Sequence, residues 1–341
     1  MKKLRVGIVG CGNIFSMHAI SIKLNNILEL VAVCDNKKER AIDAANKYQA
    51  IAYDDYENML EEANLDAIHI CTPHYLHAPM TILAAKHHVH VLTEKPMAIH
   101  KSDAKEMIRV CAEQQVFLGV IFQNRYNKGA VFLKERLTSG KLGKIKGAKC
   151  QVTWDRSDAY YMQSDWKGTW DKEGGGVVID QAIHTLDLMR WFIDSKIDYI
   201  DATIANRAHE KIDVEDTAEG MIKFKNGIIA NFHVINYHII DSPITIELYC
   251  EHGYVKYVDG LTEILYEDGK SEIVGPNPEE TVDYGKVKLY WGVSHVKQIN
   301  DFYQDILNHS KPKIDGQEAF GTQEMINAIY ESGKTGKKVF L

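Results

Sequence analysis

The chain has 341 residues, of which 45% are hydrophobic and 26% are charged, and its formal net charge is -7. The length predicts two domains, and the composition excludes a disordered, collagen-like or low-complexity chain. Because no basic field is available to attract nucleic acid or an anionic membrane, we expect a small-molecule partner.

Sequence features also restrict the compartment and the metal content. The longest apolar run, Val116 to Phe122, is far shorter than the ~20 residues of a membrane span, and the start of the chain is too short and glycine-broken for a signal peptide. The six cysteines form no close pair, which argues against a disulfide framework and predicts a cytoplasmic protein. The histidines around His87 and His90 lack a carboxylate or cysteine to complete a ligand set, so we predict no metal.

The first third of the chain alternates between predicted strands and helices. Strands are expected over residues 4–9, 28–34, 67–71, 90–92 and 116–122, and helices over 14–24, 37–48, 55–62, 77–87 and 102–114. Repeated strand–helix units predict an α/β protein with a parallel, doubly wound sheet. After about Tyr126, alternating strands replace this rhythm, as over 228–235 and 244–250. We therefore expect a dinucleotide-binding domain over residues 1–124 and a substrate-binding α/β domain over 125–341.

Ligands of such a sheet bind beyond the carboxyl ends of its strands, so the residues that follow each strand are the candidate site. They are glycine-rich or polar: Gly10 to Asn13, Asp35 and Asn36, Thr72 to His74, Glu94 to Pro96, and Gln123 to Arg125.

A glycine turn and an acidic residue predict the cofactor. Gly10 and Gly12 follow the first strand and let the backbone approach a pyrophosphate, although Phe15 stands where a small residue is expected. Asp35 can accept both ribose hydroxyls, and capping the next helix is its alternative role. The negative charge of Asp35 favours NAD, while the nearby Lys37 and Lys38 leave NADP possible.

Lys95 lies between Glu94 and Pro96 just after a predicted strand. Proline confines the residue before it to extended geometry, which limits where the amine can point. At the ligand edge of the sheet, an ammonium can bind a substrate hydroxyl and lower its pKa. A solvated lysine at a turn is the alternative.

Three glycines, Gly174 to Gly176, precede a helix predicted over residues 177–192. Asp180, His184 and Asp187 share one face of that helix because they are spaced by four and three residues. The glycine run indicates that something, such as a ligand, packs very close to the chain. We interpret His184 as a general base oriented by Asp187, with Asp180 completing the polar set; a surface pair or half of a zinc motif are the alternatives.

The segment from Trp154 to Trp170 holds five aromatic residues interleaved with charged ones. Flat apolar faces beside hydrogen-bonding groups suit a polyhydroxylated ring, so we favour Tyr161 and Trp166 as substrate contacts. A small core beneath a long loop is an equal alternative for Trp154.

Taken together, four motifs resemble the Gfo/Idh/MocA family of glucose-fructose oxidoreductase and inositol dehydrogenase. The motifs are Gly10-Cys11-Gly12-Asn13-Ile14 with His18, Thr72-Pro73-His74-Tyr75-Leu76-His77, Glu94-Lys95-Pro96, and the stretch from Gly174 to Asp187. The resemblance implies an N-terminal Rossmann domain and a C-terminal α/β domain whose large open, mostly antiparallel sheet builds homodimers or homotetramers. It also implies that Lys95, Asp180 and His184 are catalytic, with His295 as a less secure candidate.

Strand ends and resemblance together predict two sets of binding residues. The expected cofactor contacts are Gly10, Gly12, Asn13, Ile14, Asp35, Asn36, Thr72, His74, His77, Glu94, Lys95, Gln123, Trp166 and Lys167. The expected substrate contacts are Arg125, Tyr161, Trp166, Asp180 and His184.

The expected activity is NAD(P)-dependent oxidation of a secondary hydroxyl of a sugar, sugar derivative or inositol, with hydride passing to nicotinamide. One alternative is an NADPH-dependent reductase of a keto sugar or a dihydrodiol-type compound. Others are a non-catalytic nucleotide-sensing regulator on the same fold and an enzyme that uses NAD only transiently within its cycle.

Overall fold

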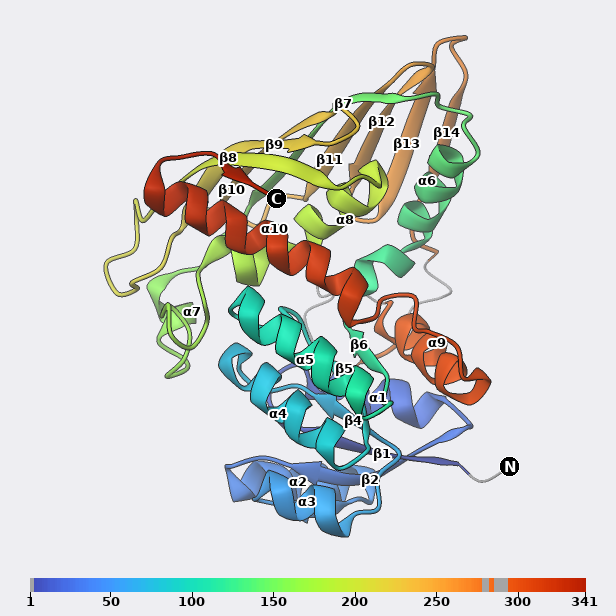
Figure 1. Cartoon of the computed structure of the whole chain (residues 1–341), viewed down its shortest axis with the longest axis vertical. Helices are drawn as coiled ribbons and strands as arrows, with labels where there is room; N and C mark the ends of the chain where they lie inside the picture. Colours follow the sequence, from blue (N-terminus) through green and yellow to red (C-terminus); the bar gives the residue numbers. More distant parts are fainter. Residues whose placement is uncertain (1–2, 278–281, 285–293) are drawn as a thin grey trace. The chain divides into compact units, whose positions relative to one another are not determined.

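The computed structural model describes residues 3–277, 282–284 and 294–341 (Figure 1). The chain divides into two compact units. The first comprises Met1–Gln123 and Val282–Gly321, and the second comprises Asn124–Thr281 and Thr322–Leu341. Within the described residues, no helix has both the length and the apolar character needed to span a membrane.

In the described part of the first unit, six strands form a parallel sheet in the order β3-β2-β1-β4-β5-β6. The strands are β1 (Leu4–Val9), β2 (Leu28–Cys34), β3 (Ile51–Tyr53), β4 (Ala67–Ile70), β5 (His90–Thr93) and β6 (Leu118–Val120). The doubly wound sheet predicted from the strand–helix rhythm is confirmed. The short strand β3 was not predicted, because its three residues are mostly exposed and carry no buried run.

Helices cover this sheet and fix its core. They are α1 (Phe15–Leu24), α2 (Lys38–Tyr48), α3 (Tyr56–Glu62), α4 (His74–Lys86), α5 (Lys101–Glu113) and α9 (His295–Asn308). Helices α4 and α5 pack against each other (Figure 1). Helices α1, α2 and α9 share a buried cluster with the sheet, to which they contribute Phe15, Ala19, Ile22, Ala44, Ala45, Ile299, Phe302, Tyr303 and Ile306.

Helix α9 corrects the expected domain division, which placed residues 125–341 together. Residues 282–321 belong to the first unit, because the apolar stripe of α9 packs against α1. Burying a side chain such as Ile299 or Phe302 contributes roughly 1.5–3 kcal/mol each, and Phe302 lies so close to Gly119 that an added Cβ there would be 2.8 Å away. Helical spacing predicts the stripe but not which core receives it.

In the described part of the second unit, nine strands form a sheet in the order β14-β13-β12-β11-β7-β10-β9-β8-β15. The strands are β7 (Ile145–Thr153), β8 (Ile197–Ala205), β9 (Thr217–Phe224), β10 (Ile229–Ile235), β11 (Thr245–Cys250), β12 (Gly253–Val258), β13 (Leu261–Tyr266), β14 (Ser271–Val274) and β15 (Val339–Phe340). Among the described strands of this sheet, β7 and β10 are the only neighbours that run parallel, and the other pairs are antiparallel. The expectation of a large, mostly antiparallel sheet is confirmed.

The other elements of the second unit include helices on one face of this sheet. They are the 3-10 turn Gln123–Tyr126, α6 (Lys128–Thr138), α7 (Asp158–Tyr161), the π-helical segment Val177–Ala182, α8 (Ile183–Ile193) and α10 (Gly316–Thr335). The 3-10 turn and α10 each begin in the first unit and continue into the second. Helix α8 packs on β7, and α10 lies beside β8 (Figure 1). The Ala202 N–H of β8 donates a hydrogen bond to the Ser332 hydroxyl of α10 at 2.9 Å. The predicted helix over 177–192 therefore forms in two parts.

Candidate active site

The glycine turn after β1 has the geometry of a phosphate cradle. At Gly10, where φ is +94°, an added Cβ would lie 2.5 Å from the Cys71 carbonyl oxygen, so only glycine fits. At Gly12 an added Cβ would meet nothing within 4 Å among the described residues. Helix α1 begins at Phe15 without a side-chain cap from Ile14, and the N–H groups of Phe15 and Met17 donate to the carbonyls of Gly12 (3.3 Å) and Ile14 (3.0 Å). The positive end of the helix dipole is therefore what would attract an anion here.

Asp35 connects this turn to the loop after β2. Its buried carboxylate accepts hydrogen bonds from the backbone N–H groups of Cys11 (2.8 Å) and Lys37 (2.9 Å). The carboxylate has lone pairs left for ribose hydroxyls, and its charge, after burial, helps to raise the pKa of the Cys11 thiol to about 12. The open turn, the uncapped helix start and the buried acid fit a dinucleotide.

Phe15 does not disturb the turn. Its ring is buried in the cluster under α1 and α2 and meets the Tyr48 ring edge-on, with the centroids 5.6 Å apart. The structure accommodates a large residue at this position because the side chain points into the core. The remaining predicted contacts of this region are surface-accessible: Asn13 and Asn36 are exposed, and Ile14 and Thr72 are half-buried.

The buried side chain of His77 lies between two loops of the first unit and contacts both. Its Nδ1 lies 2.7 Å from the Pro96 carbonyl and its Nε2 lies 2.8 Å from the Thr72 carbonyl. Each ring nitrogen faces a backbone carbonyl, and the side chain is fully buried. Burial lowers the pKa of His77, and a neutral imidazole has one N–H, so the ring donates to one of the two carbonyls at a time. The structure thus places His77 behind the cofactor loops, and His74 packs beside it with ring centroids 5.8 Å apart.

Glu94 lies at the end of a buried hydrogen-bonded chain. Its Oε1 accepts from His18 Nε2 at 2.9 Å, and His295 Nε2 lies 3.4 Å from the same oxygen. Further in, His18 Nδ1 and His69 Nδ1 are 2.8 Å apart, and His69 Nε2 is 2.8 Å from the Tyr303 hydroxyl. The carboxylate of Glu94 is thus directed into the core of the first unit, while its neighbour Lys95 is half-buried.

His18, Glu94 and His295 also have ligand atoms within 4.8 Å of one another. The separation of 2.9 Å between His18 Nε2 and Glu94 Oε1 is a hydrogen-bond length. Two zinc ligands, each ~2.0–2.1 Å from the ion in tetrahedral geometry, would lie more than 3 Å apart. The spacing therefore favours a hydrogen-bonded cluster.

The glycine run in the second unit makes room for protein atoms. An added Cβ at Gly175 would lie 2.0 Å from the Tyr330 hydroxyl, and one at Gly176 would lie 1.9 Å from the Glu215 carbonyl oxygen. The close neighbours inferred from three glycines are thus parts of this chain. They position the π-helical segment Val177–Ala182, a geometry that often marks functional sites.

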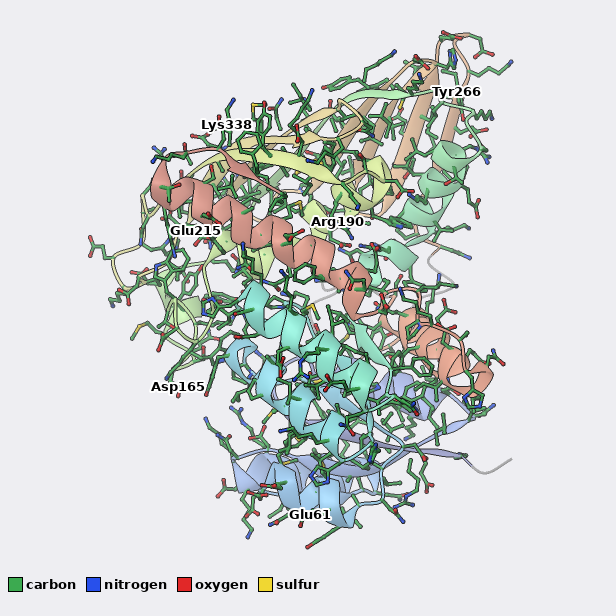
Figure 2. All side chains as sticks on the ribbon, viewed as in Figure 1. Glu61, Asp165, Arg190, Glu215, Tyr266 and Lys338 are labelled. Atoms are coloured by element: carbon green, nitrogen blue, oxygen red, sulfur yellow. The ribbon has the colours of Figure 1, made fainter. Side chains whose placement is uncertain are left out.

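Glu215, labelled in Figure 2, holds the start of this segment. Its carboxylate accepts from the backbone N–H groups of Gly176 (2.9 Å) and Val178 (3.0 Å) and from the Tyr330 hydroxyl (2.9 Å). Burial nevertheless raises the pKa of Glu215 to about 7. The run before Asp180 is therefore anchored by an acid that titrates near neutral pH.

Asp180 is the centre of a polar cluster. Its Oδ2 accepts from Lys167 Nζ (2.9 Å), the Tyr160 hydroxyl (3.0 Å) and Gln181 Nε2 (2.7 Å). Burial alone would lower the pKa of Lys167, but Asp180, Tyr160 and Glu173 together outweigh it and the pKa is raised. Burial, helped by Asp180, raises the pKa of the Tyr160 hydroxyl. A charged amine and a neutral phenol therefore both donate to one carboxylate.

Glu173 adds a second acid to this cluster. It is fully buried, accepts from the Gly168 N–H and lies 3.8 Å from Lys167 Nζ. Burial, followed by the charge of Asp180, raises the pKa of Glu173 to about 8. His184 is half-buried on α8, four residues after Asp180.

Asp187 has a different role from the one expected. Instead of orienting His184, its two oxygens accept from Arg125 Nε (2.7 Å) and Nη2 (2.6 Å), and Thr322 Oγ1 donates to one of them. Burial would raise the pKa of Asp187, but Arg125 holds it below the usual range. Both partners are buried, so the structure places the predicted substrate contact Arg125 in an ion pair.

The aromatic segment separates into core and site residues. Tyr161 is 2% exposed in a small core with Ile212 and Val214, and its hydroxyl is bound by Asn236. Its neighbour Tyr160 is the one that reaches Asp180. Trp166 is half-buried, with Lys167 Nζ 4.9 Å from its ring centroid. Trp154 donates to the Ser242 carbonyl and stacks under Arg156.

The predicted catalytic residues are thus distributed over both units. Lys95 belongs to the first unit, as do Gln123, which is buried, and His295. Asp180 and His184 belong to the second. Sequence reasoning missed Tyr160, Glu173 and Glu215 as parts of the site. For Glu173, the only signal in the sequence is its charge beside the glycine run. Glu215 gives no local signal, because it is 39 residues from Gly176, from whose N–H it accepts a hydrogen bond.

Comparison with known proteins agrees with these two halves. Residues 4–122 match the family model "Oxidoreductase family, NAD-binding Rossmann fold", and residues 131–256 match "GFO/IDH/MocA C-terminal domain". The chain belongs to the Gfo/Idh/MocA family. As a family member it is an NAD-binding oxidoreductase.

Named relatives cover nearly the whole chain. D-Glucoside 3-dehydrogenase of Escherichia coli (strain K12) is 28% identical over 99% of this chain and 97% of its own, and myo-inositol 2-dehydrogenase of Thermotoga maritima is 24% identical over 92% of each. The WlbA dehydrogenase of Bordetella pertussis, solved with NADH and UDP-GlcNAcA, is 27% identical with a TM-score of 0.86 over 100% of this chain and 99% of its own.

Proposed function

We propose that this Gfo/Idh/MocA protein oxidises a secondary hydroxyl of a sugar, a sugar derivative or an inositol, with NAD as the hydride acceptor. The observation that carries this is the Asp180 carboxylate, which three donors hold on a π-helical turn four residues before His184. The names of two relatives, a glucoside 3-dehydrogenase and an inositol 2-dehydrogenase, support a secondary hydroxyl on a ring.

Each side chain has a distinct role in this proposal. His184 accepts the hydroxyl proton, because an imidazole can gain a proton near neutral pH. The ammonium of Lys95 stabilises the developing alkoxide. Asp180 orients the hydroxyl, and its three donors prevent it from turning away. When bound, NAD supplies the nicotinamide carbon that accepts the hydride.

Gly10, Gly12, Asn13, Asp35 and Asn36 would hold the dinucleotide. Asp35 supports NAD over NADP, because its buried carboxylate would repel a 2′-phosphate. Lys37 and Lys38 are exposed beside it and could partly offset this repulsion. Titration with NADH and NADPH decides the point, since tighter binding of NADPH would contradict the role of Asp35 and favour a reductase.

The test is a panel of inositols, hexoses, glucosides, sugar phosphates and nucleotide sugars, scored by the absorbance of newly formed NADH. We expect turnover of at least one ring polyol, and a ~10²–10⁴-fold lower kcat for Lys95→Ala and His184→Ala with NAD binding retained. Lys86→Ala on α4, which removes an exposed lysine, is the matched control. Undiminished turnover of Lys95→Ala would remove the lysine from the mechanism.

A further inference from the structure

The turn that carries Lys95 is anchored on both sides by buried imidazoles. Glu94, which precedes Lys95, accepts from His18, and the carbonyl of Pro96, which follows Lys95, binds His77. The backbone N–H of Lys95 itself donates to Glu94 Oε2 at 3.2 Å. The residue on each side of the lysine is therefore fixed to a helix behind the sheet edge, α1 through His18 and α4 through His77.

We propose that Glu94, His18 and His77 are positioning residues that hold the Lys95 backbone and so aim its ammonium at the substrate hydroxyl. This inference rests on the proposed function only for the role of Lys95. It assigns the Glu94 carboxylate to the lysine turn, whereas the sequence suggested a cofactor contact.

The directions of the hydrogen bonds support a rigid anchor. An ionised carboxylate only accepts, so His18 Nε2 carries the proton toward Glu94. His18 Nδ1 is then bare in a neutral ring and accepts from His69 Nδ1, and His69 Nε2 accepts from the Tyr303 hydroxyl at 2.8 Å. A single arrangement of the protons therefore gives every hydrogen bond from Tyr303 to Glu94 one donor and one acceptor.

The charge states agree with this order. Burial lowers the pKa of both His18 and His69, which keeps the rings neutral. Burial would raise the pKa of Glu94, but the bonds from His18 and His295 outweigh it and hold the pKa well below its usual range. The other ionisable groups that feel Glu94 are His69, Cys71 and His77.

Such an anchor matters because catalysis is sensitive to small displacements. A misplacement of about 1 Å can cost ~10²-fold in rate. A lysine ammonium lies at the end of a flexible four-carbon stem, so a displaced backbone would add to the freedom that the side chain already has, and fixing the backbone on both sides removes that contribution. Burying polar groups in a hydrophobic core costs free energy. Three imidazoles and a tyrosine are buried behind this one turn, and holding the turn in place is a function that explains this cost.

The test is a double-mutant cycle between Glu94→Gln and Lys95→Ala, with methyl glucoside or myo-inositol as the probe, whichever is turned over faster. In the otherwise wild-type enzyme, Glu94→Gln is expected to lower kcat by ~10²-fold while the Kd for NAD changes by less than about threefold. In the Lys95→Ala background, Glu94→Gln should cost nothing further, because it acts through the lysine. Equal losses in both backgrounds would overturn the proposal.

Two further variants test the hydrogen-bonded chain from Tyr303 to Glu94 at its two ends, and a third variant is a control. Tyr303→Phe removes the far donor and should lower kcat by several-fold, less than Glu94→Gln. Glu94→Asp keeps the negative charge and both acceptor oxygens, of which Glu94→Gln retains only one, and should recover part of the loss. Tyr56→Phe removes a hydroxyl that binds the Met80 carbonyl elsewhere in the first unit (3.0 Å), and its kcat should stay at the wild-type value. If Glu94→Gln fails to fold, Tyr303→Phe takes its place in the cycle.

Two measurements keep this proposal separate from the proposed function. A crystal structure of Glu94→Gln with NAD, which needs no substrate, should show the Lys95 backbone displaced by about 1 Å; an unmoved turn would overturn the positioning role even if the dehydrogenase activity is confirmed. Metal analysis of the purified protein should find no stoichiometric zinc. One equivalent of zinc that His18→Asn removes would instead make the cluster a metal site.

Discussion

The Asp180 carboxylate illustrates how one residue can be held by donors of different kinds. Lys167 supplies a charge, Tyr160 a neutral hydroxyl and Gln181 an amide, all to the same Oδ2 atom. All three hydrogen bonds are charge-assisted because the acceptor is an ionised carboxylate, and Lys167 contributes most because its donor carries a full charge as well. Tyr160 and Gln181 fix the orientation of the carboxylate.

The adjacent pair Tyr160 and Tyr161 provides a matched test of this arrangement. Tyr160→Phe should lower kcat by ~10-fold, because a donor to Asp180 is lost, with little change in stability. Tyr161→Phe should leave kcat within about twofold but lower the free energy of unfolding by ~1 kcal/mol, since it removes the hydroxyl that Asn236 binds. Steady-state kinetics and urea unfolding check both, and a reversed pattern would assign the site to Tyr161.

Gly12 tests the phosphate cradle at the residue scale. An added Cβ would meet no described atom of the protein within 4 Å, so Gly12→Ala should change the free energy of unfolding by less than about 1 kcal/mol. The same methyl would occupy the space expected for the pyrophosphate, so NAD binding should weaken by tenfold or more. Calorimetry and thermal unfolding measure the two effects, and unchanged NAD affinity would contradict this location of the phosphates.

At the scale of elements, the segment before α8 depends on a distant acid. Val177–Ala182 is π-helical, and its first N–H groups bind Glu215, the acid at the loop before β9. Alpha-helical continuation would shift Asp180 relative to His184. The arrangement of these two side chains is therefore set by a contact that helical periodicity in the sequence does not contain.

Glu215 makes this segment sensitive to pH. Its pKa is raised from 4.5 to about 7 in the folded protein, so the folded state binds more protons than the unfolded state between these values. Stability should therefore fall as pH rises from about 4.5 to about 7, by roughly 3 kcal/mol from this group. Urea unfolding at pH 5, 6, 7 and 8 measures this fall.

Substitution identifies the responsible group. Glu215→Gln removes the ionisation, so its stability should vary less with pH than that of the wild type over the same range. The control is Glu263→Gln, an exposed position on β13, which should retain the wild-type slope. An unchanged slope in Glu215→Gln would assign the pH dependence to other groups.

At the scale of the whole molecule, the sequence predicted the first unit well because most of its strands are buried and helices α2 and α5 are amphipathic. The predicted strands over 4–9 and 28–34 have the bounds of β1 and β2. Helix α4 begins at His74, three residues before its predicted start, because Pro73 sits at the cap position, where its fixed φ suits a helix start.

The remainder depended on contacts between residues far apart in the sequence. Asp187 and Arg125 are 62 residues apart, and no local pattern indicates that they form an ion pair. In the same way, the choice between Tyr160 and Tyr161 depends on which ring faces the small core with Ile212. Spacing identified the motifs, while tertiary packing decided which of their residues are structural.

A row of exposed apolar side chains on one face of the second sheet leads to a prediction about assembly. Strand register places Tyr254 opposite Tyr249 on one side and Leu265 on the other, and Tyr249 and Leu265 are 42% and 50% exposed. Ile229 on β10 is also exposed. An apolar row of this kind is more typical of an interface than of a free surface.

We therefore expect this face to pair two copies of the chain. Leu265→Asp places a charge in the row without touching the buried side of β13, so it should shift the protein toward monomer with its unfolding midpoint little changed. Lys256→Asp, an exposed position on β12 that already carries a charge, should perturb assembly less. Light scattering during size-exclusion chromatography measures the mass of each variant. A Leu265→Asp protein with the same mass as the wild type would exclude this face as the interface, because a buried carboxylate there would have no partner.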